Sequence, residues 1–351
     1  MSFMPQSPLA SPATWTGEKI ATSGMTDWLL ELSQPELTEL SAAVAAARRR
    51  SLAVSEIAPA NFELPLLGPK LKRIGREVEF GRGFSLIRGL PAVDLSLEEL
   101  RLAFFGMSTY LGIPLGQSGK NDILGDVRNE AAVLDENTRG YKLGEALAYH
   151  NDCVGIVGLL CVRPARSGGV SKIVSATAVH NIVMIERIDL LRALYDEPCY
   201  YSWQGDGPVG QLNYYWFRCF SYFEGRLTTR WLPREVMQFH DDMPEIPRMS
   251  AQLREALEFT DAVANRDGLA FDMRFQPGDI QYLNDSVIWH SRTAYEDDPD
   301  LSRRRHLLRV WLNPYAPRPV APDLENIHDA LGDAAVWPRR RIYPVPVHDT
   351  W

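Results

Sequence analysis

The stretch that decides how this chain is organised is Tyr149-His150-Asn151-Asp152-Cys153-Val154-Gly155. Side chains alternate along an extended strand, so His150 and Asp152 project to one side while Asn151 points away. One strand therefore offers an imidazole and a carboxylate to a common point. A third ligand, His290, lies far downstream. Two histidines and one carboxylate can hold iron(II) with three adjacent positions open, so we predict an iron site at His150, Asp152 and His290.

Arginines interrupt the apolar segment that follows the third expected ligand, Arg303-Arg304-Arg305-His306-Leu307-Leu308-Arg309-Val310-Trp311-Leu312. A guanidinium on the inward face of a strand is costly unless an anion meets it, and arginine can hold a carboxylate through two parallel hydrogen bonds. Iron ligands followed by a carboxylate clamp are what an enzyme that uses 2-oxoglutarate requires. With a period of two, the side chains that share one face are Arg305, Leu307, Arg309 and Trp311.

The order of these motifs resembles that of the taurine dioxygenase (TauD/TfdA-like) family. The similarity covers roughly residues 80–315 and includes the H-x-D strand, the apolar run 157–162 with the turn Ser167-Gly168-Gly169, and Phe275-Gln276-Pro277-Gly278-Asp279 before His290. The resemblance implies a clavaminate synthase-like fold, which is a mainly β, α+β architecture: a double-stranded β-helix, or jelly roll, with flanking helices. It also implies iron(II), with 2-oxoglutarate and O2 as co-substrates.

The resemblance also assigns expected roles in binding 2-oxoglutarate. Ser171 stands where the family places a hydroxyl that helps to hold a carboxylate of 2-oxoglutarate, although an ordinary turn serine would look the same. Arg305, with Arg309, is expected to bind the far carboxylate, because the spacing of the two arginines matches the family's pair. The separation from His290 is longer than in taurine dioxygenase, which leaves open whether Arg304 or Arg309 takes the main role.

Several activities fit this ligand set. The expected reaction is hydroxylation of an unactivated C–H bond in a small organic substrate, an amino acid or carboxylate, in specialised metabolism. Desaturation or cyclisation would need the same iron and the same co-substrate. A zinc hydrolase could also use two histidines and a carboxylate, but the arginine segment and the lack of an H-E-x-x-H motif disfavour it. A jelly-roll protein that binds a ligand without catalysis is the alternative from another class.

Composition excludes some partners. The formal net charge is -8 and the isoelectric point is about 5.5, which disfavours non-specific binding to nucleic acid. No apolar run reaches the roughly 18 residues of a membrane span, and the N-terminus lacks the pattern of a secretory signal. We therefore expect a cytoplasmic enzyme with a small-molecule substrate; assembly into a homo-oligomer is left open. Four cysteines without C-x-x-C spacing are expected to be free thiols.

One domain is predicted over residues 1–351. It comprises an N-terminal arm and helix (1–80), a jelly-roll core with inserted helices (80–315) and a Pro-rich tail (316–351). Residues 113–145 are expected to form a loop that covers the metal, and 271–283 a hairpin-like approach to His290. Helices are expected after capping boxes at Ser33 and Ser96 and over 250–263, and strands over 84–88, 154–162 and 170–175.

Overall fold

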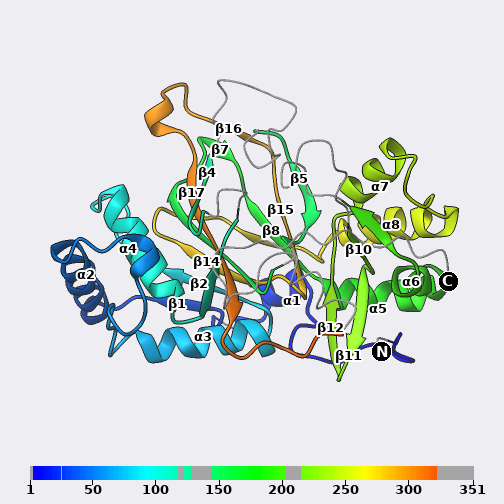
Figure 1. The fold of residues 1–351 in the computed structure, drawn as a ribbon, viewed down its shortest axis with the longest axis horizontal. Helices are drawn as coiled ribbons and strands as arrows, with labels where there is room; N and C mark the ends of the chain where they lie inside the picture. The colour runs from blue at the N-terminus through cyan, green and yellow to red at the C-terminus, as the bar shows by residue number, and fades with distance from the viewer. Residues whose placement is uncertain are drawn as a thin grey trace.

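The computed structural model describes residues 3–24, 26–117, 122–128, 144–152, 154–201 and 215–321. Two β-sheets of unequal size form the centre, and helices cover the assembly at both ends of the view in Figure 1. Side chains from both sheets line a single internal cavity, so the inner faces of the two sheets enclose it. This is the layered arrangement expected of a jelly roll.

The larger sheet is built around β17 (His306–Pro314). This strand pairs on one side with β6 (Ile156–Arg163), and on the other its two halves pair with β4 (Gly125–Arg128) and β3 (Gly112–Leu115). β6 is nearly all apolar because both of its faces are covered. The order of the sheet is β1 (Leu29–Glu31), β2 (Phe84–Arg88), β14 (Ile280–Asn284), β6, β17 and β3, with β4 also on β17.

The smaller sheet contains the strands of both expected histidine ligands. All of its neighbouring strands are antiparallel, and β15 (Ile288–Arg292) lies between β8 (Ser171–Ser175) and β5 (Leu147–His150). The outer neighbour of β8 is β13 (Phe271–Met273). Three strand pairs complete the β structure: β9 (Cys199–Tyr201) with β10 (Tyr215–Phe217), β11 (Phe220–Phe223) with β12 (Arg226–Thr229), and β7 (Ser167–Gly168) with β16 (Tyr295–Glu296).

Helices cover each end of the molecule. On the larger sheet, α3 (Gly68–Phe80) and α4 (Leu97–Ser108) pack directly against strands, and α2 (Gln34–Arg49) packs on α4. No described helix is long and apolar enough to cross a membrane. The other helical segments among the described residues are α1 (Gly17–Thr22), α5 (Ala176–Glu186), α6 (Ile188–Asp196), α7 (Pro233–Asp242), α8 (Ala251–Ala264) and the short 3-10 turns Val54–Glu56 and Leu301–Arg303.

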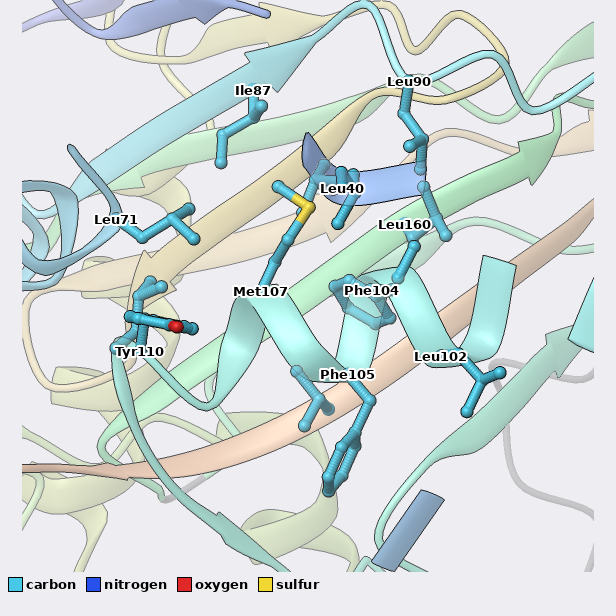
Figure 2. Close-up of a cluster of buried hydrophobic side chains, with 14 of the residues drawn as sticks. Leu40, Leu71, Ile87, Leu90, Leu102, Phe104, Phe105, Met107, Tyr110 and Leu160 are labelled. Atoms are coloured by element: carbon cyan, nitrogen blue, oxygen red, sulfur yellow. The ribbon is translucent and has the colours of Figure 1, made fainter. Parts of the chain in front are cut away.

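A large apolar core fills the space between α4 and the larger sheet. Phe104 and Met107 of α4 meet Leu160 of β6 in this core (Figure 2). The one hydroxyl that β14 contributes, from Tyr282, lies 2.8 Å from the Ser108 hydroxyl, so neither polar group is left unsatisfied. The core therefore fixes the outer face of the sheet whose inner face carries the expected arginines.

Both predicted capping boxes are present. The main-chain N–H of Ser33 donates to the Glu36 carboxylate at 2.8 Å, and that of Ser96 donates to the Glu99 carboxylate at 2.9 Å. The predicted strand over 84–88 is confirmed as β2. Local hydrogen bonds decided where the two helices begin, because a cap uses only residues within one helical turn.

Two predictions were wrong. The expected hairpin over 271–283 does not form, because β13 pairs in the smaller sheet while β14 pairs in the larger one. The intervening residues connect the two sheets. A sequence pattern does not distinguish such a connection from the tight turn of a hairpin. The expected loop over 113–145 instead contains most of β3 and all of β4. Both strands form hydrogen bonds with the long strand β17. Residues 118–121 and 129–143 of that segment lie outside the described residues.

The buried histidine of α5 makes stability depend on pH. His180 is fully buried, with Nε2 3.0 Å from the Tyr195 hydroxyl. Burial lowers the pKa of His180 from 6.5 to about 4. Between these values only the unfolded chain binds the proton, so this contribution is complete above pH 6.5 and is lost as pH falls toward 4. Urea unfolding of the wild type should show that this group lowers the free energy of unfolding by about 3 kcal/mol between these two pH values. The free energy of unfolding should depend less steeply on pH in His180→Gln. The same dependence on pH in both proteins would contradict the prediction.

Candidate metal centre

His150 and His290 face each other from neighbouring strands. β15 runs antiparallel to β5 with His290 directly opposite His150, and the centroids of their rings are 4.3 Å apart. Directly opposite residues of an antiparallel pair have Cβ atoms about 4.5–5.5 Å apart. Strand register alone therefore brings together two imidazoles that are far apart in the sequence.

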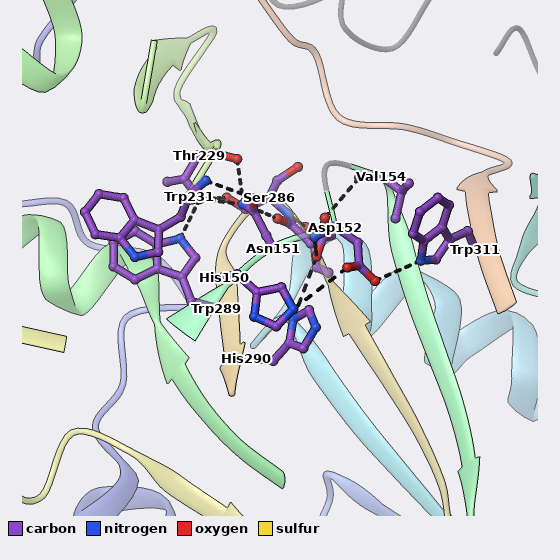
Figure 3. Close-up of polar contacts among 12 residues, drawn as sticks. His150, Asn151, Asp152, Val154, Thr229, Trp231, Ser286, Trp289, His290 and Trp311 are labelled. Carbon is purple, nitrogen blue, oxygen red and sulfur yellow. Dashed lines mark hydrogen bonds and ion pairs between the residues drawn. The ribbon is translucent and has the colours of Figure 1, made fainter. Parts of the chain in front are cut away.

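Asp152 completes the group just beyond the end of β5. Its Oδ1 lies 3.9 Å from His150 Nε2. Its Oδ2 accepts hydrogen bonds from Trp311 Nε1 at 2.8 Å and from Arg309 Nη1 at 3.3 Å. These donors hold Oδ2 away from the histidines and leave Oδ1 facing them. One ligand atom from each of the three residues lies within 4.8 Å of the others. Figure 3 shows the three side chains turned toward one another.

Asn151 points away from this group and fastens the strand to the other side. Its Oδ1 accepts a hydrogen bond from the main-chain N–H of Trp231 at 2.9 Å. Its Nδ2 donates to the carbonyl oxygens of Thr229 and Asp285, both at 2.9 Å. The alternation expected along the strand is therefore present, with ligands on one side and an anchor on the other (Figure 3).

Asp285 fixes the main chain around Asp152 from the turn between β14 and β15. One of its carboxylate oxygens accepts from the N–H of Asp152 at 3.0 Å, and the other accepts from the N–H of Val154 at 2.9 Å. Burial, and then the negative charge of Asp152, raise the pKa of the fully buried Asp285. A carboxylate that has no exposure to solvent thus holds the main chain of Asp152, the expected carboxylate ligand, in position.

The donors fit a ferrous ion. His150 Nδ1 lies 2.9 Å from the Ala148 carbonyl oxygen, and donation to that oxygen leaves the Nε2 lone pair for a metal. His290 Nδ1 is buried without a hydrogen-bond partner among the described residues. Burial lowers the pKa of His290 to about 3, so the ring is neutral. Burial opposes ionisation of Asp152, but the Arg309 charge helps to hold its pKa below the ordinary value. Two imidazoles and a carboxylate suit iron(II).

Arg309 lies at the metal end of the cavity. Besides its contact with Asp152, its Nε donates to Gln117 Oε1 at 2.8 Å, and Gln117 Nε2 donates back to the Arg309 carbonyl oxygen at 2.8 Å. Its guanidinium carbon lies 4.7 Å from the centroid of the Trp311 ring. Arg309 is thus fixed beside the Asp152 carboxylate. The other expected arginine, Arg305, lies elsewhere in the cavity.

Arg305 lines the same cavity but makes different contacts. It is 5% exposed and forms no ion pair with any described residue, and its Nη1 is buried without a hydrogen-bond partner among them. Gly169, at φ 66°, lets this side chain approach closely, since an added Cβ there would lie 3.3 Å from Arg305 Nε. Ser171 is buried in the same cavity, with its hydroxyl 3.3 Å from Gln281 Oε1.

Sequence reasoning missed four residues at this site. Asp285 belongs to the polar triplet 284–286 between two apolar strands, a signal that was available in the sequence. Arg292 follows His290 by two positions and so shares its face, which was also readable from the strand period. Gln117 and Tyr295 reach the site only through sheet pairing, and no local pattern marks them. Cys153, one of the four expected free thiols, lies outside the described residues.

Comparisons with known proteins show the family of this chain. The family model "Taurine catabolism dioxygenase TauD, TfdA family" matches residues 48–311. FR-33289 synthase of Streptomyces rubellomurinus is 27% identical over 315 residues, 87% of this chain and 90% of that protein. A taurine hydroxylase-like protein of Stachybotrys chartarum is 27% identical over 311 residues, 84% of this chain and 77% of that protein.

Solved structures of iron oxygenases share the fold. Asparagine oxygenase in complex with Fe(II), 2S,3S-3-hydroxyasparagine and succinate gives a TM-score of 0.64 at 15% identity, covering 82% of this chain and 93% of that one. The non-heme iron oxygenase OrfP with Fe, succinate and (3S)-hydroxy-L-Arg gives 0.60 at 12% identity, covering 81% and 94%. These similarities confirm the predicted jelly-roll fold.

Replacing the carboxylate ligand should abolish iron binding. Asp152→Asn keeps the shape but removes the negative charge, so Fe(II) affinity, measured by anaerobic equilibrium dialysis, should fall by roughly 100-fold or more, beyond the loss typical of outer-shell changes. Asp272→Asn is the matched control, because Asp272 is half exposed on β13 and pairs with Lys172. Equal iron binding by both variants would remove Asp152 from the ligand set.

Replacing Asp285, which holds the turn that carries Asp152, should weaken iron binding less than replacing Asp152 itself. Asp285→Asn retains one acceptor oxygen but places an NH2 group against one of the two main-chain N–H donors. The turn should then lose its fixed position, and Fe(II) affinity should fall by about 10- to 100-fold. The same dialysis measurement applies, and wild-type affinity in this variant would show that the carboxylate does not position the ligand.

Proposed function

This chain belongs to the TauD/TfdA family of iron(II)- and 2-oxoglutarate-dependent dioxygenases, and we propose that it hydroxylates an unactivated carbon of a small amino acid or carboxylic acid. We assign the iron to His150, Asp152 and His290. The observation that carries most weight is the convergence of these three residues within 4.8 Å at one end of a cavity that also contains buried arginines.

We assign Arg309 of β17 and Arg305, the residue directly before that strand, to different ends of the co-substrate. Arg305 is buried with an unpartnered guanidinium nitrogen, so it is the group that best suits the far carboxylate of 2-oxoglutarate. Ser171 lines the same cavity and can add a hydroxyl donor. Arg309 already contacts Asp152 and is therefore placed beside the metal rather than at the far carboxylate.

The protein's own contribution is positioning and exclusion of water. When bound, ferrous iron with 2-oxoglutarate and O2 supplies the oxidising power to break a C–H bond, which side chains lack. Trp311 and Arg309 hold the second oxygen of Asp152, so that the ligand cannot turn away from the metal. Apolar residues of the larger sheet, including Val157 and Leu159, line the cavity and limit the access of water.

The solved relatives support an amino-acid substrate. Asparagine oxygenase was crystallised with hydroxyasparagine and OrfP with a hydroxylated arginine, each together with succinate. An amino acid with an acidic group would suit a cavity that contains several guanidinium groups. Hydroxylation, desaturation and cyclisation share the same iron and co-substrate, so the identity of the product decides among them.

Substrate-dependent succinate formation tests the proposal. Amino acids and organic acids should be screened with Fe(II), 2-oxoglutarate and O2, and the product of any active compound should gain one oxygen atom by mass spectrometry. Succinate formation that needs no iron or no O2 would contradict the proposed chemistry. A folded protein that binds Fe(II) and 2-oxoglutarate but turns over none of a broad panel would favour a binding role.

Removing the guanidinium of Arg305 should weaken 2-oxoglutarate binding. Loss of one partner of a buried charged contact costs about 2–5 kcal/mol, so Arg305→Gln should raise the Kd for 2-oxoglutarate by at least about 30-fold. Anaerobic titration of the visible charge-transfer band of the iron complex measures this. Arg303→Gln is the control, since Arg303 has the same charge but its side chain is 72% exposed. Equal Kd values for the two variants would exclude Arg305 from the binding site.

A further inference from the structure

We propose that Cys199 and Cys219 are a reversible redox pair, and that the disulfide bond between them clamps the strand pair β9–β10. The proposal goes beyond the proposed function and does not depend on it, because neither cysteine lines the cavity at the metal centre. The oxidant is a small-molecule disulfide such as oxidised glutathione. Three observations carry the proposal: the contact between the two sulfur atoms, their place beside a small strand pair, and their connection to the ligand strand.

The two sulfur atoms are already in contact. Sγ of Cys199 lies 3.4 Å from Sγ of Cys219, although the residues are 20 positions apart in the sequence. Neither residue is part of a disulfide in the structure, so both side chains are thiols. A disulfide bond is about 2.05 Å long, and the sulfurs therefore need to approach each other by roughly 1.4 Å. Rotations of two short side chains can provide a movement of this size.

Strand pairing and apolar packing hold the two thiols together. Cys199 begins β9, and its partner in β10 is Phe217, so Cys219 follows two positions after that partner. Cys199 is fully buried and Cys219 is 2% exposed, in the apolar core that also contains Trp231. Close packing leaves the side chains of such a core few alternative positions. The contact between the sulfurs is therefore a fixed feature of the folded protein.

The strand pair beside the thiols is small enough to open locally. Among the described residues, β9 and β10 share three residue pairs and form a two-stranded sheet that joins neither of the larger sheets. An isolated strand pair of this size is only marginally stable, and local opening of such an element exposes groups that are buried in the folded state. Opening therefore gives a small disulfide access to the thiols. A bond between Cys199 and Cys219 then keeps the pair closed.

The thiol pair is connected to the support of the metal ligands. The carbonyl oxygen of Cys219 accepts a hydrogen bond from the main-chain N–H of Arg230 at 2.9 Å. The next residue, Trp231, donates its N–H to Asn151 Oδ1 at 2.9 Å and accepts from the Asn151 N–H at 3.0 Å. Asn151 lies between two of the assigned iron ligands. A disulfide at Cys219 would therefore restrain the part of the molecule to which the ligand strand is fastened.

Oxidation takes two steps of thiol–disulfide exchange. The thiolate of one cysteine attacks a sulfur of oxidised glutathione, which forms a mixed disulfide and releases one glutathione thiolate. The second cysteine loses its proton and attacks the protein sulfur of the mixed disulfide, which forms the bond between Cys199 and Cys219 and releases the other glutathione. The two cysteines together lose two protons and two electrons. One molecule of oxidised glutathione takes up both and becomes two molecules of reduced glutathione.

The experiment incubates the full-length protein with oxidised glutathione without O2, so that oxygen cannot act as the oxidant. The remaining thiols are then alkylated, and the protein is digested without reductant and analysed by mass spectrometry. We expect a cross-linked peptide that joins Cys199 to Cys219, and its loss after treatment with dithiothreitol. The oxidised protein should also have a Tm higher by about 5 °C, because the cross-link restricts the unfolded chain.

Variants assign the cross-link to this pair. Cys199→Ala and Cys219→Ala should each abolish the cross-link and the rise in Tm, whereas Cys161→Ala, which removes a buried thiol of β6, should keep both. No loss of thiols in the wild type, or glutathione attached to both cysteines without a cross-link, would overturn the proposal. So would a cross-link that uses Cys153 or Cys161 in place of either partner. A cross-link between Cys199 and Cys219 that leaves Tm unchanged would refute the clamp.

Discussion

The structure depends on keeping one carboxylate ionised inside the protein. Asp152 is 8% exposed, and a buried anion is tolerated only when cations and hydrogen-bond donors surround it. Trp311 and Arg309 provide donors from the larger sheet, while the two histidines face it from strands of the smaller sheet. The carboxylate therefore links the two sheets, and a divalent metal would complete its charge balance on the remaining side.

The surrounding elements hold this centre from two directions. Asp285 fixes the main chain of the ligand turn, and Asn151 attaches the same strand to β12 and the residues that follow it. Behind them, Trp231 stacks on Trp289 with ring centroids 4.2 Å apart and planes 7° from parallel (Figure 3). Because the indole of Trp289 lies next to His290 in sequence, this stack ties the ligand strand to the helical side of the molecule. Rigid support of this kind limits the positions that the ligands can adopt.

Charge is distributed along the cavity in a way that suits a dicarboxylate. Arg309 is already engaged with Asp152, whereas Arg305 forms no ion pair with any described residue. Arg292 joins Arg305 on the ring of Tyr295. The burial of these guanidiniums costs free energy in the isolated protein, and binding of an anion would recover it. The same arrangement explains why Gly169 has no side chain, since a Cβ there would press on Arg305.

The sequence by itself predicted that His150, Asp152 and His290 converge, which arginines of the later strand face inward, where the capped helices begin, and the family. These features depend on strand alternation, helix caps and motif order, all of which are local or linear properties. Only the tertiary structure decided that β13 and β14 lie in different sheets, that β3 and β4 pair with β17, and that Arg309 contacts Asp152 while Arg305 forms no ion pair with any described residue. Gln117 and Tyr295 joined the site for the same reason. Strand partners are set by register and packing between segments that are distant in the sequence. A pattern read from neighbouring residues does not show these partners.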